Sequence, residues 1–105
     1  MKISVAEIES ASTAALTAHG AGDFQAREVA RAVARAESLG NVICGLYYLE
    51  SYCAQLATGR VNGTVEPVVS QPRGGAVLSD ARFGFSQPAF IRALPLAIKA
   101  ARENG

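Results

Sequence analysis

The sequence predicts an α+β fold with three N-terminal helices, a short antiparallel β hairpin and a kinked C-terminal helix. Apolar residues recur at helical spacing through most of residues 5–58 and again through residues 88–101. Between these regions, two short aliphatic runs are separated by a proline and a pair of glycines, which is typical of a hairpin. With 105 residues, the chain has room for a single domain, which we expect to cover residues 1–105.

The first helix is predicted to begin after Ser4 and to end near Gly20. Ser4 and Glu7 form a capping box, in which each side chain accepts a hydrogen bond from the other residue's backbone N–H. One apolar face follows at helical spacing, formed by Val5, Ile8, Ala11, Ala15 and Leu16. Ser12 interrupts this face, and its hydroxyl is expected to donate to the carbonyl of Ile8.

The second helix is predicted over residues 24–39, with Asp23 as its N-cap and Gly40 as its end. A helix of this length measures about 24 Å. Small apolar residues form one stripe, which consists of Ala26, Val29, Ala30, Val33 and Ala36. Arginines recur every four residues on another face, at positions 27, 31 and 35, where they are either solvated or paired with carboxylates.

A third helix is predicted over residues 45–58, with Gly59 as its end. Cys53 lies on its apolar face and is interpreted as a small core residue. Cys44 starts this helix and Tyr48 follows one turn later, so their side chains are expected to face the same space. If the chain has a chemical site, we expect it at this junction, within residues 39–52.

The hairpin is predicted from strands at residues 68–70 and 76–78. A loop at residues 80–86 follows, and Asp80 is expected to cap or brace it. The last helix should start at Ser86 or Gln87. Pro95 falls in its middle and removes one backbone hydrogen bond, so a kink is predicted there.

Composition excludes several classes of function. The net charge is +1 and no basic block occurs, so neither nucleic acid nor an anionic membrane surface is an expected partner. No apolar run approaches the roughly 20 residues that a membrane span needs, and residues 1–4 do not begin a signal peptide, which predicts a cytoplasmic protein. Cys44 and Cys53 are spaced for neither a zinc site nor a redox CxxC pair, so free thiols and no metal are expected.

Several short motifs succeed one another along the chain with consistent spacing. They are Ala36-Glu37-Ser38-Leu39-Gly40, Cys44-Gly45-Leu46, Leu49, Tyr52, Gly59-Arg60-Val61-Asn62, Asp80, Gly84-Phe85, Gln87 and Ala101-Arg102-Glu103-Asn104-Gly105. In this order, the chain resembles the N-terminal part of the malate/L-lactate dehydrogenase family that is distinct from the Rossmann-type enzymes. That family also contains ureidoglycolate, sulfolactate and diketogulonate oxidoreductases and cyclic-imine carboxylate reductases.

The resemblance implies site positions at which this chain departs from the family. The catalytic histidine of the family would fall on Cys44, and the arginine that helps hold the substrate carboxylate would fall on Tyr48. Gly45 matches the glycine of the family's Ser-His-Gly signature, so Tyr48 and Gly45 are the candidate substrate-binding residues. A thiol matches the proton-donating role of histidine poorly, and a phenol cannot grip a carboxylate in the bidentate manner of arginine.

The resemblance implies NAD(P) as cofactor, but the residues indicate no cofactor site in this chain alone. Gly20-Ala21-Gly22 lacks the strand-to-helix context of a dinucleotide loop and is interpreted as a turn between helices. The family's cofactor domain is expected to be absent, so the partner is either a second copy or a chain that supplies this domain. Two functions remain open: an oxidoreductase segment that is inactive alone, and a non-catalytic remnant that serves as an oligomerisation or interaction module.

Overall fold

The computed structural model describes residues 3–41 and 43–105, and within these ranges it contains four helices and one two-stranded sheet. Residues 1 and 2 of the N-terminal stretch and Val42 of the predicted junction lie outside the described residues. The elements follow in the order α1 (Val5–Ala18), α2 (Asp23–Ser38), α3 (Leu46–Thr58), β1 (Val68–Arg73), β2 (Ala76–Asp80) and α4 (Ser86–Asn104). The predicted α+β class is confirmed, and none of the helices described could cross a membrane.

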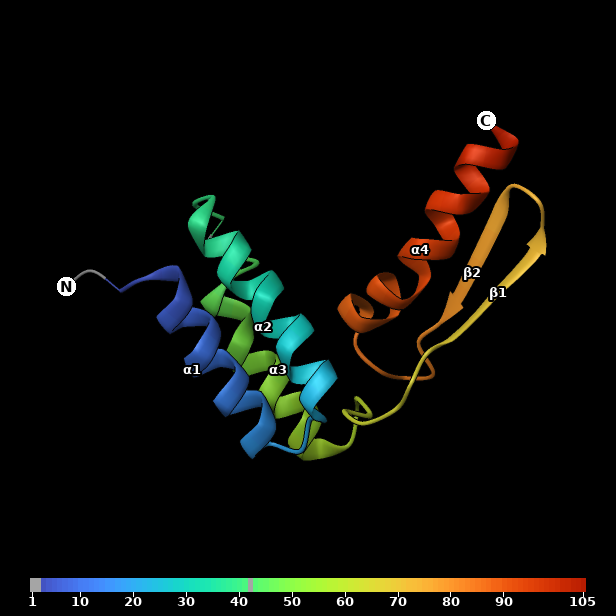
Figure 1. Ribbon diagram of the computed structural model, residues 1–105. Helices are drawn as coiled ribbons and strands as arrows, with labels where there is room; N and C mark the ends of the chain where they lie inside the picture. Colours follow the sequence, from blue (N-terminus) through green and yellow to red (C-terminus); the bar gives the residue numbers. More distant parts are fainter. Residues whose placement is uncertain (1–2, 42) are drawn as a thin grey trace.

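The elements form two arms that diverge from a common base (Figure 1). One arm is the bundle of α1, α2 and α3, and the other is α4 with the hairpin. Phe85, which caps α4, is buried against the core of the bundle, and its ring meets that of Tyr52 edge-on at 5.5 Å between centroids. This contact places the beginning of α4 beside α3.

In helix α1 the predicted N-terminal capping box is confirmed, whereas one predicted hydrogen bond is wrong. Ser4 Oγ accepts from the backbone N–H of Glu7 at 3.1 Å, and the backbone N–H of Ser4 donates to Glu7 Oε1 at 3.3 Å. The expected bond from Ser12 to the Ile8 carbonyl is absent. Ser12 is fully buried and its hydroxyl has no hydrogen-bond partner, so the side chain faces the apolar core rather than the preceding turn of its own helix.

Helix α2 contributes more buried residues to the core than any other element, mainly through the predicted small-residue stripe. Four members of the stripe are fully buried, namely Ala26, Val29, Ala30 and Val33, whereas Ala36 is half-buried. The predicted N-cap is wrong, because Gly22 caps the helix and Asp23 is its first residue. The N–H of Gly22 donates to the Gly63 carbonyl at 2.9 Å, which holds Gly22 extended and lets the helix start directly after it.

The hairpin is antiparallel, with Val68 opposite Asp80, Val69 opposite Ser79 and Ser70 opposite Leu78. The register shifts between Ser70 and Arg73, and both strands extend beyond their predicted ends. Helix α4 packs beside the hairpin, and Ser79 Oγ donates to the Ala89 carbonyl at 2.8 Å. The helix continues through Pro95, so the predicted kink there stays a prediction.

Candidate functional site

The α2–α3 junction is held closed by a carboxylate from the last turn of α2. Glu37 Oε1 accepts a hydrogen bond of 2.7 Å from the backbone N–H of Leu46, the first residue of α3. This satisfies one of the N–H groups that a helix start leaves without a partner. A Cβ added to the buried Gly45 would lie 2.5 Å from Glu37 Oε1 and 2.7 Å from its Cγ. A side chain at position 45 would therefore displace the Glu37 side chain from its place in the junction.

Cys44 lies outside the helix that it was expected to start. Helix α3 begins at Leu46, and Gly45 has φ −96° and ψ −129°, which is not helical. The expectation that Cys44 and Tyr48 share a helical face is therefore wrong, because the chain turns between them. The Cys44 side chain is exposed, and the Cys44 N–H donates to Asn41 Oδ1 at 3.3 Å.

Tyr48 begins a row of aromatic side chains that leads from the junction to the start of α4. Its ring lies 6.1 Å from that of Tyr52, one turn later, and Tyr52 in turn contacts Phe85. The side-chain amide of Gln87 donates to the Tyr52 hydroxyl at 3.4 Å. The four-residue spacing of Tyr48 and Tyr52 was a usable signal for the first half of this row. Its link to Gln87 spans 35 residues and had no local signal.

Cys53 is a core residue, as predicted. It is buried within the main apolar cluster, and this burial raises the pKa of its thiol because the thiolate is disfavoured away from water. Both cysteines are free, and no group of three or more potential ligands for a metal ion occurs within residues 3–41 and 43–105. The thiols therefore have separate environments, one solvated and one apolar.

The loop after β2 is braced as expected by Asp80, whose Oδ1 accepts from the N–H of Arg82 at 2.9 Å. Arg82 and Phe83 have positive φ values of 53° and 65°, which non-glycine residues rarely adopt. The Phe83 carbonyl accepts from the N–H of Asn62 at 2.8 Å, so the loop is tied to the segment that follows α3. The aromatic side chain of Phe83 is 88% exposed.

The Gly20–Gly22 turn does not fit the phosphates of a dinucleotide. Its three backbone N–H groups donate within the protein, to the carbonyls of Thr17, Leu16 and Gly63. A phosphate cradle needs such groups to point at the ligand. The turn also joins two helices rather than a strand and a helix. It therefore supplies no cofactor site.

The junction contains the exposed thiol of Cys44, the half-exposed phenol of Tyr48 and Gly45, which packs against the Glu37 side chain. A phenol can donate one hydrogen bond, and a thiol is a weak donor. Reduction of a carboxylate-bearing substrate also needs a hydride donor, a proton donor near the reacting carbon and a cation for the carboxylate. The junction residues alone do not complete this set.

Comparison with known proteins gives matches over the whole chain. The profile described as malate/L-lactate dehydrogenase matches residues 3–105. A Delta(1)-pyrroline-2-carboxylate/Delta(1)-piperideine-2-carboxylate reductase from Pseudomonas putida is 33% identical over 105 residues, which cover 100% of this chain and 31% of the relative. A (2R)-3-sulfolactate dehydrogenase (NADP(+)) from Chromohalobacter salexigens is 38% identical over 103 residues, which cover 98% of this chain and 31% of the relative.

Solved structures show the same arrangement of elements. The delta1-piperideine-2-carboxylate reductase from Pseudomonas syringae superposes with a TM-score of 0.95 at 30% identity, covering 100% of this chain and 32% of that protein. A malate dehydrogenase from Pyrococcus horikoshii superposes with a TM-score of 0.88 at 26% identity and is covered to 30%. The chain thus spans about a third of the length of the proteins it matches.

Proposed function

This chain belongs to the malate/L-lactate dehydrogenase family, and on that premise we propose that it is the N-terminal part of an NAD(P)-dependent oxidoreductase acting on 2-oxo or 2-hydroxy acids. One observation supports this most strongly: all 105 residues superpose on the corresponding third of a reductase whose substrate is a carboxylate. The two-arm arrangement is therefore a family feature that this chain retains.

The same proposal holds that the chain is inactive alone. Its glycine turn between α1 and α2 does not fit a dinucleotide, so the cofactor would be held by polypeptide corresponding to the remaining two-thirds of the relatives. NAD(P) would supply or accept the hydride, and this chain would contribute the α2–α3 junction to the substrate side of the site. Gly45 and Tyr48 would line that side, and Cys44 would occupy the position of the proton donor.

A chimera tests this assignment. In it, the chain replaces the matching N-terminal third of the Chromohalobacter salexigens sulfolactate dehydrogenase, and NADP(+)-dependent oxidation of sulfolactate is followed. We expect a folded chimera with low turnover, which Cys44→His combined with Tyr48→Arg raises by about a hundredfold or more, the usual contribution of a positioned acid or base.

The matched control pairs Cys44→His with Tyr47→Arg, which places the cation on the neighbouring exposed tyrosine. This control should leave turnover low. A chimera that does not fold, or a Tyr48→Arg pair no more active than the control, would contradict the assignment of the junction.

The second candidate function is a non-catalytic oligomerisation or interaction module. The favouring observation is that thiol and phenol stand at the two positions where the family carries histidine and arginine, while large apolar side chains remain exposed around them, among them Leu39, Ile43 and Tyr47. Such a surface favours self-association or a partner chain. Sedimentation of the purified chain distinguishes this candidate, since a monomer at high concentration would count against self-association.

A further inference from the structure

The turn around Cys44 is held through its backbone by two side chains that precede it. Asn41 Oδ1 accepts from the Cys44 N–H at 3.3 Å, and Glu37 Oε1 accepts from the Leu46 N–H at 2.7 Å. The Cys44 side chain is exposed and is not part of the apolar core. Where that side chain points therefore depends on how the backbone beside it is held.

Glu37 makes the more extensive of these two contacts. Besides its bond to Leu46, the half-buried Glu37 side chain packs along Gly45, where an added Cβ would lie 2.5 Å from Oε1, 2.7 Å from Cγ and 2.8 Å from Cδ. Gly45 and Leu46 directly follow Cys44, and the chain changes direction at Gly45 before α3 begins. Glu37 therefore holds the point at which the chain passes from Cys44 into the helix.

The hydrogen bonds of this turn come from nearby in the chain. Within residues 3–41 and 43–105, no hydrogen bond joins residues 43–46 to α1, α4 or the hairpin. The Glu37 carboxylate also lies at the N-terminal end of α3, where the first N–H groups lack partners within the helix and a negative charge is favoured. Loss of the Glu37 side chain would therefore free the α3 end of the turn.

The position of residue 44 matters for the proposed reaction. A general acid or base must lie within hydrogen-bond reach of the atom that gains or loses the proton. Misplacement of a reacting group by about 1 Å costs up to about a hundredfold in rate. Because Cys44 occupies the position of the proton donor only under the proposed function, a catalytic role for Glu37 rests on that assignment.

We propose that Glu37 is a positioning residue, which places the reacting group at position 44 through the backbone of Gly45 and Leu46. It does so with an acceptor oxygen at the right reach rather than with its charge. Glu37→Gln keeps such an oxygen at the end of a side chain of equal length, so it should preserve the turn. Glu37→Asp keeps the charge but is shorter by one methylene, so it should release the turn as Glu37→Ala does.

The first experiment measures the turn in the purified chain, independently of catalysis. A nitroxide is attached to the exposed Cys44 in a Cys53→Ala background, and its mobility is read by electron paramagnetic resonance, which reports the nanosecond motion of loops. We expect Glu37→Ala and Glu37→Asp to sharpen the spectrum as the label becomes more mobile, and Glu37→Gln to leave it unchanged. Circular dichroism confirms that each variant is folded.

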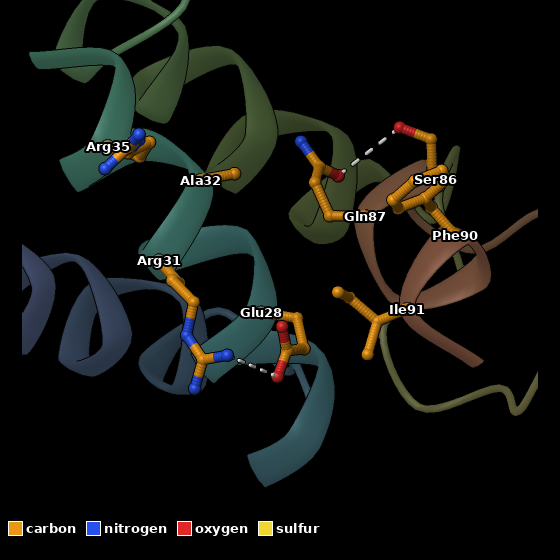
Figure 2. Close-up of a pocket in the computed structure, with 8 residues that line it drawn as sticks. All are labelled: Glu28, Arg31, Ala32, Arg35, Ser86, Gln87, Phe90 and Ile91. Atoms are coloured by element: carbon orange, nitrogen blue, oxygen red, sulfur yellow. Dashed lines mark hydrogen bonds and ion pairs between the residues drawn. The ribbon is translucent and has the colours of Figure 1, made fainter. Parts of the chain in front are cut away.

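Glu28→Ala is the matched control, since it removes the same side chain from the opposite face of α2. Glu28 and Glu37 are nine residues apart, which is about two and a half helical turns. The Glu28 carboxylate lies 3.7 Å from Arg31 and lines a groove of about 510 Å³ between α2 and α4, as Figure 2 shows. Glu28→Ala therefore loses an ion pair of the same helix but should not change the spectrum of the Cys44 label.

The second experiment measures turnover in the sulfolactate dehydrogenase chimera that carries Cys44→His and Tyr48→Arg. We expect Glu37→Ala and Glu37→Asp to lower kcat by about tenfold or more with KM changed by less than about threefold, because the reacting group is misplaced while substrate binding is retained. Glu37→Gln should recover most of the lost kcat. A purely structural role would give no such division between kcat and KM, and Glu28→Ala should not reproduce it.

Two kinds of result would overturn the proposal. A Cys44 label that ignores Glu37→Ala, or that responds equally to Glu28→Ala, would contradict the positioning role alone, as would a chimera in which Glu37→Gln loses as much kcat as Glu37→Ala. A chimera without turnover in any variant would instead overturn the proposed function, and with it the catalytic role of Glu37. The label experiment distinguishes these cases, since it reports the turn whether or not the chimera is active.

Discussion

Glu37 and Leu46 are joined across the turn between two helices by a hydrogen bond of 2.7 Å from the Leu46 N–H to Glu37 Oε1. The last turn of α2 thereby caps the first turn of α3, and the Glu37 side chain occupies the space that a Cβ at position 45 would need. The chain beside Cys44, the residue that we propose for the position of the proton donor, is thus held by a contact that does not involve the Cys44 side chain.

Gly45→Ala should destabilise the protein, because the new Cβ would lie 2.5 Å from Glu37 Oε1 and would displace the capping carboxylate. A loss of about 1–3 kcal/mol is expected in the free energy of unfolding measured with urea. Gly75→Ala is the control, since its Cβ would meet nothing closer than 3.9 Å. Equal effects of the two substitutions would contradict the close packing of Glu37 on Gly45.

Ser12→Ala should stabilise the protein by about 1–2 kcal/mol, since it removes a buried hydroxyl that has no hydrogen-bond partner. Thermal unfolding measures the change. Ser10→Ala, at an exposed position of the same helix, gains the same helix propensity without removing a buried polar group. If both variants gained the same stability, the Ser12 hydroxyl would have a hydrogen-bond partner in solution.

The two cysteines should differ in reactivity toward iodoacetamide. Cys44 is exposed, whereas burial raises the pKa of Cys53 above its ordinary value of 9.0. At any given pH, a smaller fraction of Cys53 is therefore thiolate than if its thiol were in water. Timed alkylation followed by mass spectrometry should show Cys44 modified first at pH 8. The neutral Cys53 thiol stabilises the fold below pH 9.0, and this contribution should fade as the pH rises further. Equal alkylation rates would contradict the burial of Cys53.

Arg92→Ala should destabilise the base of the two arms by about 1 kcal/mol, because it removes both the Glu66 pair and the contact with the Phe24 ring. The pair is partly solvated, which limits the loss. Lys99→Ala, which breaks an exposed pair with Glu103 at 4.0 Å, serves as the control and should change stability little. Urea unfolding compares the stabilities of the two variants. A loss for Arg92→Ala no larger than that for Lys99→Ala would show that Arg92 does not stabilise the contact between the arms.

Local features of the fold were predictable from sequence. The Ser4–Glu7 capping box and the small-residue stripe of α2 depend on residues three or four apart, and both were confirmed. The start of α2 was misplaced by one residue because the Gly22 conformation depends on Gly63, 41 residues away. Similarly, the start of α3 depends on Glu37, which sequence reasoning placed in a motif but gave no role.

The candidate site was only partly predictable. The resemblance placed Cys44, Gly45 and Tyr48 at one junction, but helical spacing wrongly put Cys44 and Tyr48 on the same face. The aromatic row from Tyr48 to Phe85 and the groove between α2 and α4 arise from packing between segments far apart in the chain. No periodicity within either segment encodes such contacts.

The most direct test of the account is calorimetric titration of the purified chain, alone, with NADH and with NADPH. We infer that the cofactor is held by polypeptide corresponding to the rest of the relatives, so we expect no saturable heat with either nucleotide. Saturable binding at micromolar concentration would contradict it, since this chain would then build a cofactor site of its own.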